Sequence, residues 1–224
     1  MGRVIADYTT PEYVHRWESL SDANKQNGAY NYSKELVKNI IPRVKTERPW
    51  VTINLPWFCE NHAIVFVHGN LYLWNYDWFK SYRDVIMVAS QLATVEALKK
   101  RGFKQVIYLP LSIDLEYVEG FKTKRKTRQV AYAGRPEKKA LGKLPEGIDL
   151  LEGLPRDDLL TEMAKYRQIY AVGRCAIEAK ALGCEIMPFD QRFPDPSVWE
   201  VLDNCEAAEI LQRELDKIDG ASHD

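Results

Sequence analysis

Residues 169–183 read IYAVGRCAIEAKALG, an apolar run followed by a glycine and then by an amphipathic stretch that a second glycine ends. The run Gln168–Val172 is typical of a strand, and Arg174–Leu182 is typical of a helix that stops at Gly183. Gly173 at the corner between them lets a ligand approach the backbone closely. The amino end of such a helix, with its N–H groups and its dipole, favours an anion such as a diphosphate.

Two side chains at this corner suit a nucleotide. The guanidinium of Arg174 can bind a phosphate, and Glu178 lies one helical turn further on, where its carboxylate can accept both hydroxyls of a ribose. An ordinary surface helix explains the same spacing, because arginine and glutamate four residues apart commonly form an ion pair. The spacing by itself favours this second interpretation.

The rest of the chain alternates predicted strands with predicted helices. Ala63–His68 (AIVFVH), Asp84–Ala89 and Gln105–Leu109 are continuous apolar runs, which are typical of strands covered on both faces. The other predicted strands are Arg3–Tyr8, Trp50–Leu55, Val130–Ala133, Ile148–Leu151 and Glu185–Met187, and the other predicted helices are Tyr30–Val44, Leu92–Arg101, Arg156–Tyr166 and residues 198–217. Strands that alternate with helices in this way predict an α/β protein with parallel sheets.

A polar, basic run divides the predicted elements into two groups. Residues 119–128 (EGFKTKRKTR) hold one apolar side chain, Phe121, so we expect a linker at 118–128. We then expect two small Rossmann-like domains that face each other across a cleft, residues 1–117 and residues 129–224, the second ending in a closing helix. The carboxyl ends of two such sheets are a common place for a ligand. A second interpretation gives the basic run a role in contacting phosphates of a nucleic-acid or lipid-diphosphate acceptor.

Composition excludes several classes of protein. Hydrophobic residues make up 46% of the chain, enough for a core, which argues against wholesale disorder. The formal net charge of −1 argues against a basic coat for nucleic acid. No apolar run has the length of a membrane span. The four cysteines and four histidines are scattered, which predicts no metal site and reduced thiols in a cytoplasmic protein.

The segment around Gly173 resembles the nucleotide-sugar-binding helix of GT-B glycosyltransferases. That pattern is a glycine, a few residues, and then Glu-Ala-x-Ala-x-Gly; Gly173, Glu178 and Gly183 match it, together with the two alanines. The resemblance implies that Glu178 contacts the ribose of the nucleotide. The commonest form of the family has a further glutamate eight residues earlier that contacts the donor sugar, and this chain has Tyr170 there.

Segments of the first half also resemble this family. Asn27–Leu36 is similar to the loop and helix where a glycine, here Gly28, approaches the donor. Val85–Asp114 resembles the run that ends the first domain. His68 resembles the histidine at the end of a first-domain strand, which implies a contact with the sugar or the acceptor. The alternative is a strand-end histidine that is bonded to backbone, and the sequence leaves both open.

Val130–Lys139 is similar to the opening of the second domain, where a Gly-Arg pair and a following lysine hold the diphosphate. Arg135 matches the arginine, and either Lys138 or Lys139 matches the lysine. With these pieces the resemblance covers residues 27–190 in register. The second domain is shorter than the family's, with no room after Arg135 for the usual long helix and strand.

The resemblance implies a shortened glycosyltransferase, of the hexosyltransferase kind and retaining, that moves a sugar from a nucleotide-diphosphate-sugar to an unknown acceptor with no metal or other cofactor. The residues assigned to catalysis are His68, Arg135 and Lys139. Those assigned to donor binding are Gly28, Lys138, Gly173, Arg174, Cys175 and Glu178. One alternative is a non-catalytic GT-B-like protein that binds a nucleotide or acts as a scaffold. Another is a glycosyltransferase that modifies nucleic acid, which requires the basic run and the aromatic stretch 71–82 to line one groove; that stretch is otherwise explained as core or lid.

Overall fold

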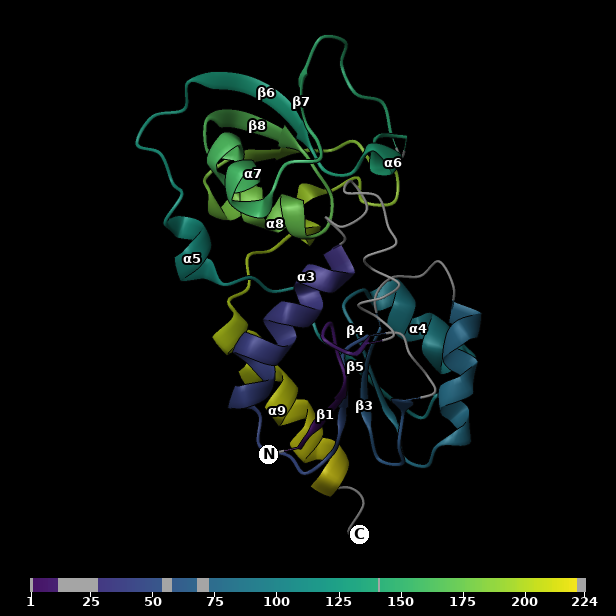
Figure 1. The fold of residues 1–224 in the computed structure, drawn as a ribbon. Coiled ribbons are helices and arrows are strands. Elements are labelled where there is room, and N and C mark those ends of the chain that lie inside the picture. The colour runs from purple at the N-terminus through teal and green to yellow at the C-terminus, as the bar shows by residue number, and fades with distance from the viewer. Residues whose placement is uncertain (1, 12–27, 54–57, 68–72, 141, 221–224) are drawn as a thin grey trace. The chain divides into compact units, whose positions relative to one another are not determined.

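The computed structural model describes residues 2–11, 28–53, 58–67, 73–140 and 142–220. The described residues form two compact units. The first unit contains residues 2–11, residues 204–220 and the described part of 28–111, and the second contains the described part of 112–203. Each unit is built on a parallel sheet with helices packed against it, so the predicted α/β class is confirmed (Figure 1).

The described strands of the first unit form a five-stranded parallel sheet in the order β1-β2-β3-β4-β5. These strands are β1 (Val4–Ala6), β2 (Trp50–Val51), β3 (Ile64–Val67), β4 (Ile86–Ala89) and β5 (Gln105–Tyr108). Every residue of β3 and β4 is buried, as their continuous apolar runs predict. The order along the sheet follows the chain, with no reversal among these described strands.

Helices cover both faces of this first sheet. Figure 1 shows α3 (Gly28–Glu35) and α9 (Asn204–Gly220) on one side and α4 (Leu92–Lys100) on the other, and the 3-10 helix η4 (Leu73–Ser81) adds buried rings to the cluster beneath α4. The single helix predicted for Tyr30–Val44 changes pitch twice. After α3 it continues as a π-helix, η1 (Leu36–Ile40), and then as a 3-10 turn, η2 (Ile41–Arg43), where proline has no N–H to extend the ladder.

The second unit has a four-stranded parallel sheet in the order β7-β6-β8-β9. Its strands are β6 (Arg128–Ala133), β7 (Asp149–Leu151), β8 (Tyr166–Tyr170) and β9 (Glu185–Met187). After β6 the chain therefore adds β7 on one side of β6, and then crosses over to add β8 on the other side. This reversal makes a topological switch point between the carboxyl ends of β6 and β8, a place where open α/β sheets commonly bind ligands.

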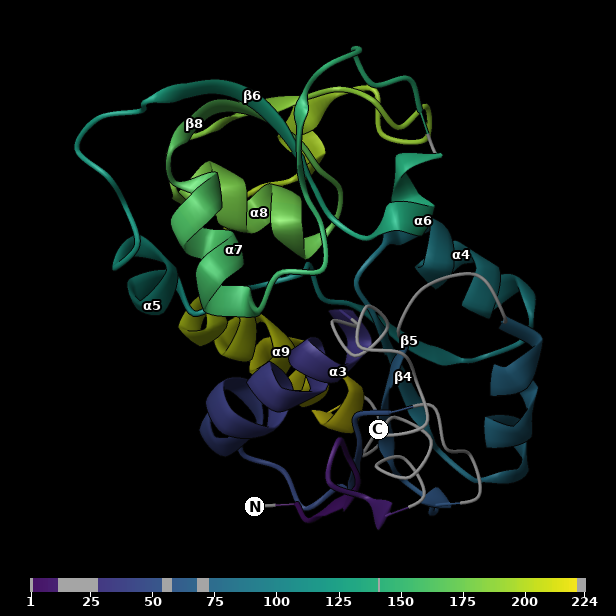
Figure 2. The same ribbon diagram turned by 45° about the horizontal axis from the view of Figure 1, so that its top comes forward.

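The helices of the second unit are α5 (Leu115–Glu119), α6 (Pro136–Lys139), α7 (Arg156–Met163), α8 (Arg174–Ala181) and the 3-10 turn η5 (Pro196–Val198). Helices α7 and α8 lie side by side on one face of the sheet (Figure 2), and α5 packs against α8. Each of α7 and α8 follows a strand directly, so both begin at the carboxyl edge of the sheet.

The division into units differs from the expected boundaries. Residues 118–128, the expected linker, fall within the second unit, where Val118 is fully buried in α5. The chain passes between the units at 111–112 and again at 203–204, and α9 belongs to the first unit. Within the second unit, Ile113 forms an isolated parallel bridge with Asp203, whose carboxylate accepts from the Leu115 backbone N–H at 3.2 Å.

One lysine of the basic run, Lys126, caps the carboxyl ends of two helices. The Nζ atom of Lys126 donates to the Ala164 carbonyl at 2.9 Å and to the Leu182 carbonyl at 2.8 Å. These are the C-cap residues of α7 and α8, where backbone carbonyls lack helical partners and the helix dipole favours a cation. The same ammonium lies 3.4 Å from the Cys184 Sγ atom. Lys126 therefore packs against the second unit and is not part of a solvated linker.

No helix of the described residues is long and apolar enough to cross a membrane.

Candidate functional site

Two glycine corners lie at the carboxyl edge of the second sheet, one on each side of the switch point. Strand β6 leads into Gly134 and Arg135, and β8 leads through two residues to Gly173. The two strands are neighbours, with Tyr132 opposite Tyr170, so both corners occupy the same edge. The pairing of β6 with β8 therefore brings the ends of these two segments to one edge of the sheet.

Each corner requires glycine for a different reason. Gly173 has φ 65° and ψ −138°, a backbone conformation that side chains disfavour, and it is the N-cap of α8. Its carbonyl accepts from Ala176 N at 3.0 Å, which starts the helix. At Gly134 a Cβ atom would lie 2.8 Å from the Tyr132 hydroxyl, so a side chain there would displace the ring. The chain therefore makes both turns without bulk at the switch point.

Glu178 holds two arginines at this edge. Its Oε1 atom lies 3.3 Å from Arg174 Nη2 and 3.1 Å from Arg156 Nη2. The Glu178 side chain is 6% exposed and that of Arg174 is 9% exposed. The arginine–glutamate pair that helical spacing predicts is present, and Arg156 joins it from the first position of α7. Sequence reasoning missed Arg156 because α7 and α8 are separate helices and only the tertiary fold brings their first turns together.

Tyr117 of α5 covers the Arg156 side of this cluster. The Arg156 guanidinium carbon lies 5.4 Å from the Tyr117 ring centroid, a cation–π contact. The Tyr117 hydroxyl donates to Asp157 Oδ1. Burial, followed by the Asp157 hydrogen bond, raises the pKa of Tyr117 to about 12.

The residues after β6 supply the other predicted positive groups. Arg135 is partly buried, and its carbonyl accepts from the Tyr132 hydroxyl at 2.8 Å. Lys139 ends α6, and its Nζ atom lies 3.0 Å from Glu152 Oε1, just beyond β7. Lys138 belongs to α6, but its side chain is outside the described part of the structure.

The remaining predicted site residues are Cys175, Gly28 and His68. Cys175 is the second residue of α8 and is partly buried. Gly28 is the first residue of α3 in the first unit. His68 lies outside the described residues. Of the predicted site residues that the structure describes, all but Gly28 therefore fall within the second unit.

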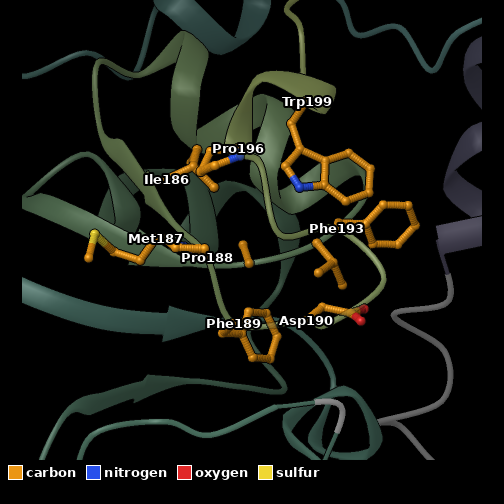
Figure 3. A pocket seen from close by; sticks show the side chains of 10 residues that line it. Ile186, Met187, Pro188, Phe189, Asp190, Phe193, Pro196 and Trp199 are labelled. Carbon is orange, nitrogen blue, oxygen red and sulfur yellow. The ribbon is translucent and has the colours of Figure 1, made fainter.

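A crevice next to β9 is lined by residues that include Phe189, Asp190 and Trp199 (Figure 3). The Tyr170 ring meets the Phe189 ring edge-on at 6.2 Å, so this tyrosine, in the place of the family's first glutamate, packs against an aromatic neighbour. Asp190 is buried, and both its oxygens accept hydrogen bonds from Arg192, with Nε to Oδ1 at 3.1 Å and Nη2 to Oδ2 at 2.7 Å. The crevice has no room for a water-sized sphere. It is packed protein rather than a ligand pocket.

The structure bears on both segments that the nucleic-acid interpretation requires, the basic run and the aromatic stretch. Lys126 of the basic run caps two helices, as described above. From the aromatic stretch, Tyr76 and Phe79 are buried in the hydrophobic cluster of the first unit. These rings support the core interpretation of that stretch.

Comparison of the chain with protein-family models, curated proteins and solved structures finds no match. Among the described residues, no group of three or more histidine, cysteine or acidic side chains is arranged to hold a metal ion.

Proposed function

We propose that the second unit binds the diphosphate of a nucleotide-sugar at the switch point between β6 and β8, and that the chain is a glycosyltransferase of the GT-B kind. The observation that carries the proposal is the reversal of strand order at which Gly134-Arg135 and Gly173-Arg174 follow the two neighbouring strands. Doubly wound sheets of the Rossmann type bind nucleotides at this position.

Charge supports a diphosphate as the ligand. Arg135 and Arg174 follow the two strands, and the positive dipole end of α8 begins at the same edge. Arg156 brings a further guanidinium from the start of α7. Arginine suits phosphate because its planar donors match two phosphate oxygens at once. The site therefore favours a dianionic or trianionic group over a neutral one.

In the proposed reaction, the bond between the anomeric carbon of the sugar and the diphosphate oxygen breaks. A bond from that carbon to the acceptor forms, and the acceptor loses a proton. Arg135 and the start of α8 stabilise the charge that develops on the leaving diphosphate. Lys138 keeps its predicted role as a donor contact within this proposal.

Thermal unfolding against a panel of nucleoside diphosphates and nucleotide-sugars tests the binding. A ligand at about 100 times its Kd stabilises the native state by roughly 2.7 kcal/mol. We expect a rise in Tm for one nucleotide class and its loss in Arg135→Ala. Lys180→Met is the matched control, because Lys180 is an exposed cation at the other end of α8. No rise with any nucleotide in the wild-type protein would refute the proposal.

A specific observation favours a second candidate, a nucleotide-binding protein without transferase activity. Two predicted site residues are already paired within the unit, Lys139 with Glu152 and Glu178 with two arginines. Release of nucleoside diphosphate from the bound nucleotide-sugar separates the two candidates. The transferase releases it, at least slowly by hydrolysis, and His68→Ala slows the release; the binding protein shows affinity without release.

A further inference from the structure

We propose that Tyr132 is a positioning residue, whose hydroxyl holds the Gly134-Arg135 turn and so sets the place of the Arg135 guanidinium beside the leaving diphosphate. The inference rests on the proposed function, because Arg135 is the group through which Tyr132 acts. It assigns a role to a residue outside the predicted site, and it follows from one hydrogen bond at the carboxyl end of β6.

The Tyr132 hydroxyl is a polar atom in an apolar part of β6. Tyr132 is 1% exposed, and the alanines on either side of it in the strand are also buried. A buried hydroxyl without a hydrogen-bond partner carries a desolvation cost that phenylalanine at the same position avoids. The Tyr132 hydroxyl donates to the Arg135 carbonyl at 2.8 Å. This hydrogen bond therefore ties a core strand to the turn that follows it.

Gly134 leaves the room that this hydrogen bond needs. A Cβ atom at position 134 would lie 2.8 Å from the Tyr132 hydroxyl oxygen and 3.1 Å from the ring carbon that carries it. The first distance is shorter than two such atoms tolerate, so a side chain at this position would push the hydroxyl away from the Arg135 carbonyl. Tyrosine at 132 and glycine at 134 are therefore matched to one another, and together they fix the backbone that leads into Arg135.

Two further aromatic rings hold the Tyr132 ring in place. The Phe189 ring meets the Tyr132 ring edge-on, with the centroids 5.7 Å apart. Phe189 also meets Tyr170 edge-on at 6.2 Å, and Tyr170 lies opposite Tyr132 in the pairing of β6 with β8. Edge-on contacts fix the angle of a ring as well as burying it. Packing from β8 and from the segment after β9 therefore directs the Tyr132 hydroxyl at the Arg135 carbonyl.

Arg135 is a group whose position matters to the proposed reaction. A guanidinium stabilises charge on a leaving diphosphate best when it needs no reorganisation at the moment of reaction. Arg135 is partly buried, and it forms no ion pair with any carboxylate in the described part of the chain, whereas Lys139 is paired with Glu152. Its guanidinium is therefore not committed to an internal partner, and the turn that carries it is the element that must be fixed.

Titration calorimetry tests the inference with two probes, inorganic pyrophosphate and the nucleoside diphosphate that the unfolding panel selects. Tyr132→Phe removes only the hydroxyl and keeps the ring with its edge-on contact to Phe189. We expect this variant to weaken both probes by a similar factor, about fivefold, which is the loss that one ordinary hydrogen bond predicts. Affinities are measured at a temperature where circular dichroism shows each variant fully folded.

A double-mutant cycle with Arg135→Ala separates positioning from a general loss of structure. If Tyr132 acts through Arg135, adding Tyr132→Phe to Arg135→Ala weakens pyrophosphate no further. Tyr166→Phe is the matched control, because Tyr166 is also a fully buried tyrosine of this sheet, and its hydroxyl donates to Asp149 at 2.7 Å. Tyr166 is the first residue of β8, at the amino edge of the sheet, so its variant should leave both affinities unchanged.

Two results would overturn the inference. One is wild-type affinity for both probes in Tyr132→Phe, and the other is an equal loss from Tyr132→Phe with and without the Arg135 guanidinium. Either result leaves the proposed function standing where Arg135→Ala weakens the nucleoside diphosphate. If the wild-type protein binds neither pyrophosphate nor any nucleoside diphosphate, the proposed function fails and this inference fails with it.

If Tyr132→Phe does not fold, Phe189→Leu tests the same inference from the ring that braces Tyr132. Leucine keeps an apolar side chain but lacks the edge-on contact with the Tyr132 ring. Positioning predicts weaker pyrophosphate binding in Phe189→Leu, and no further loss when Phe189→Leu is added to Arg135→Ala. Unchanged pyrophosphate affinity in Phe189→Leu would then contradict the inference.

Discussion

Replacing Lys126 by methionine removes one ammonium from the ends of two helices while keeping most of the side chain's length and apolar stem. The ammonium donates to the carbonyls of Ala164 and Leu182 at 2.9 and 2.8 Å. A hydrogen bond with one charged partner contributes about 1.5–3 kcal/mol, and a cation at a helix C-terminus contributes about 0.3–1 kcal/mol. Because Lys126 is partly exposed, solvent reduces both, and we expect a loss of about 2–3 kcal/mol.

Urea unfolding of Lys126→Met, followed by circular dichroism, measures this loss. The variant Lys124→Met is the matched control, since it removes an exposed lysine two positions away and should change the free energy of unfolding by about 0.5 kcal/mol or less. Cys184 provides a second readout. Burial raises the pKa of its thiol and Lys126 lowers it, so Lys126→Met should raise that pKa further and slow alkylation of Cys184 in the native state.

Equal free energies of unfolding for the Lys126 and Lys124 variants would refute the reasoning. The cap would then contribute no more than a surface charge, and the basic run would again be best explained as a solvated segment. A loss that persists in high salt is expected, because partly buried charges are screened less than exposed ones.

Two further predictions concern the first unit. Glu35→Ala should lower the free energy of unfolding by about 1–3 kcal/mol, because it leaves the buried Asn204 amide, which donates to Glu35 at 2.8 Å, without that acceptor; urea unfolding beside Glu47→Ala, an exposed control, measures it, and equal losses would contradict it. Asp77 has its pKa lowered from 3.8 to about 2, chiefly by the hydrogen bond from Arg101, so it stabilises the native state above about pH 4 and loses that effect as pH falls toward 2. The difference in Tm between the wild-type protein and Asp77→Asn should therefore be modest near neutral pH and vanish near pH 2, and a difference that does not change with pH would count against this pairing.

Local pattern was enough to predict several elements. The apolar runs that become β3 and β4 are buried on both faces, and a run without polar residues has no other stable place. Strand β9 has the predicted bounds Glu185–Met187 because Gly183 lies just before it and Pro188 follows it, and α8 has its predicted start at Arg174 because Gly173 precedes it. These signals depend on near neighbours in the chain, which the sequence displays directly.

Neither the boundary of the second unit nor the capping of α7 and α8 by Lys126 could be predicted in this way. The run around Lys126 is polar, and polarity alone does not distinguish a solvated linker from a segment that docks on helix ends. Helix α5 lies partly in the expected linker, yet its Val118 is fully buried. The difference depends on whether unsatisfied carbonyls of α7 and α8 are within reach, and that is a property of the folded unit.

The sequence by itself determined the α/β class, the positions of most strands and helices, and the two glycine corners, because periodicity, apolar runs and glycine act over a few residues. Only the tertiary structure decided the strand order that brings the corner after β6 beside the corner after β8. It also decided that Glu178 receives Arg156 as well as Arg174. The physical reason is the same in both cases: packing sets which strands pair and which charges share a buried space, and pairwise distances between remote residues leave no mark on local sequence.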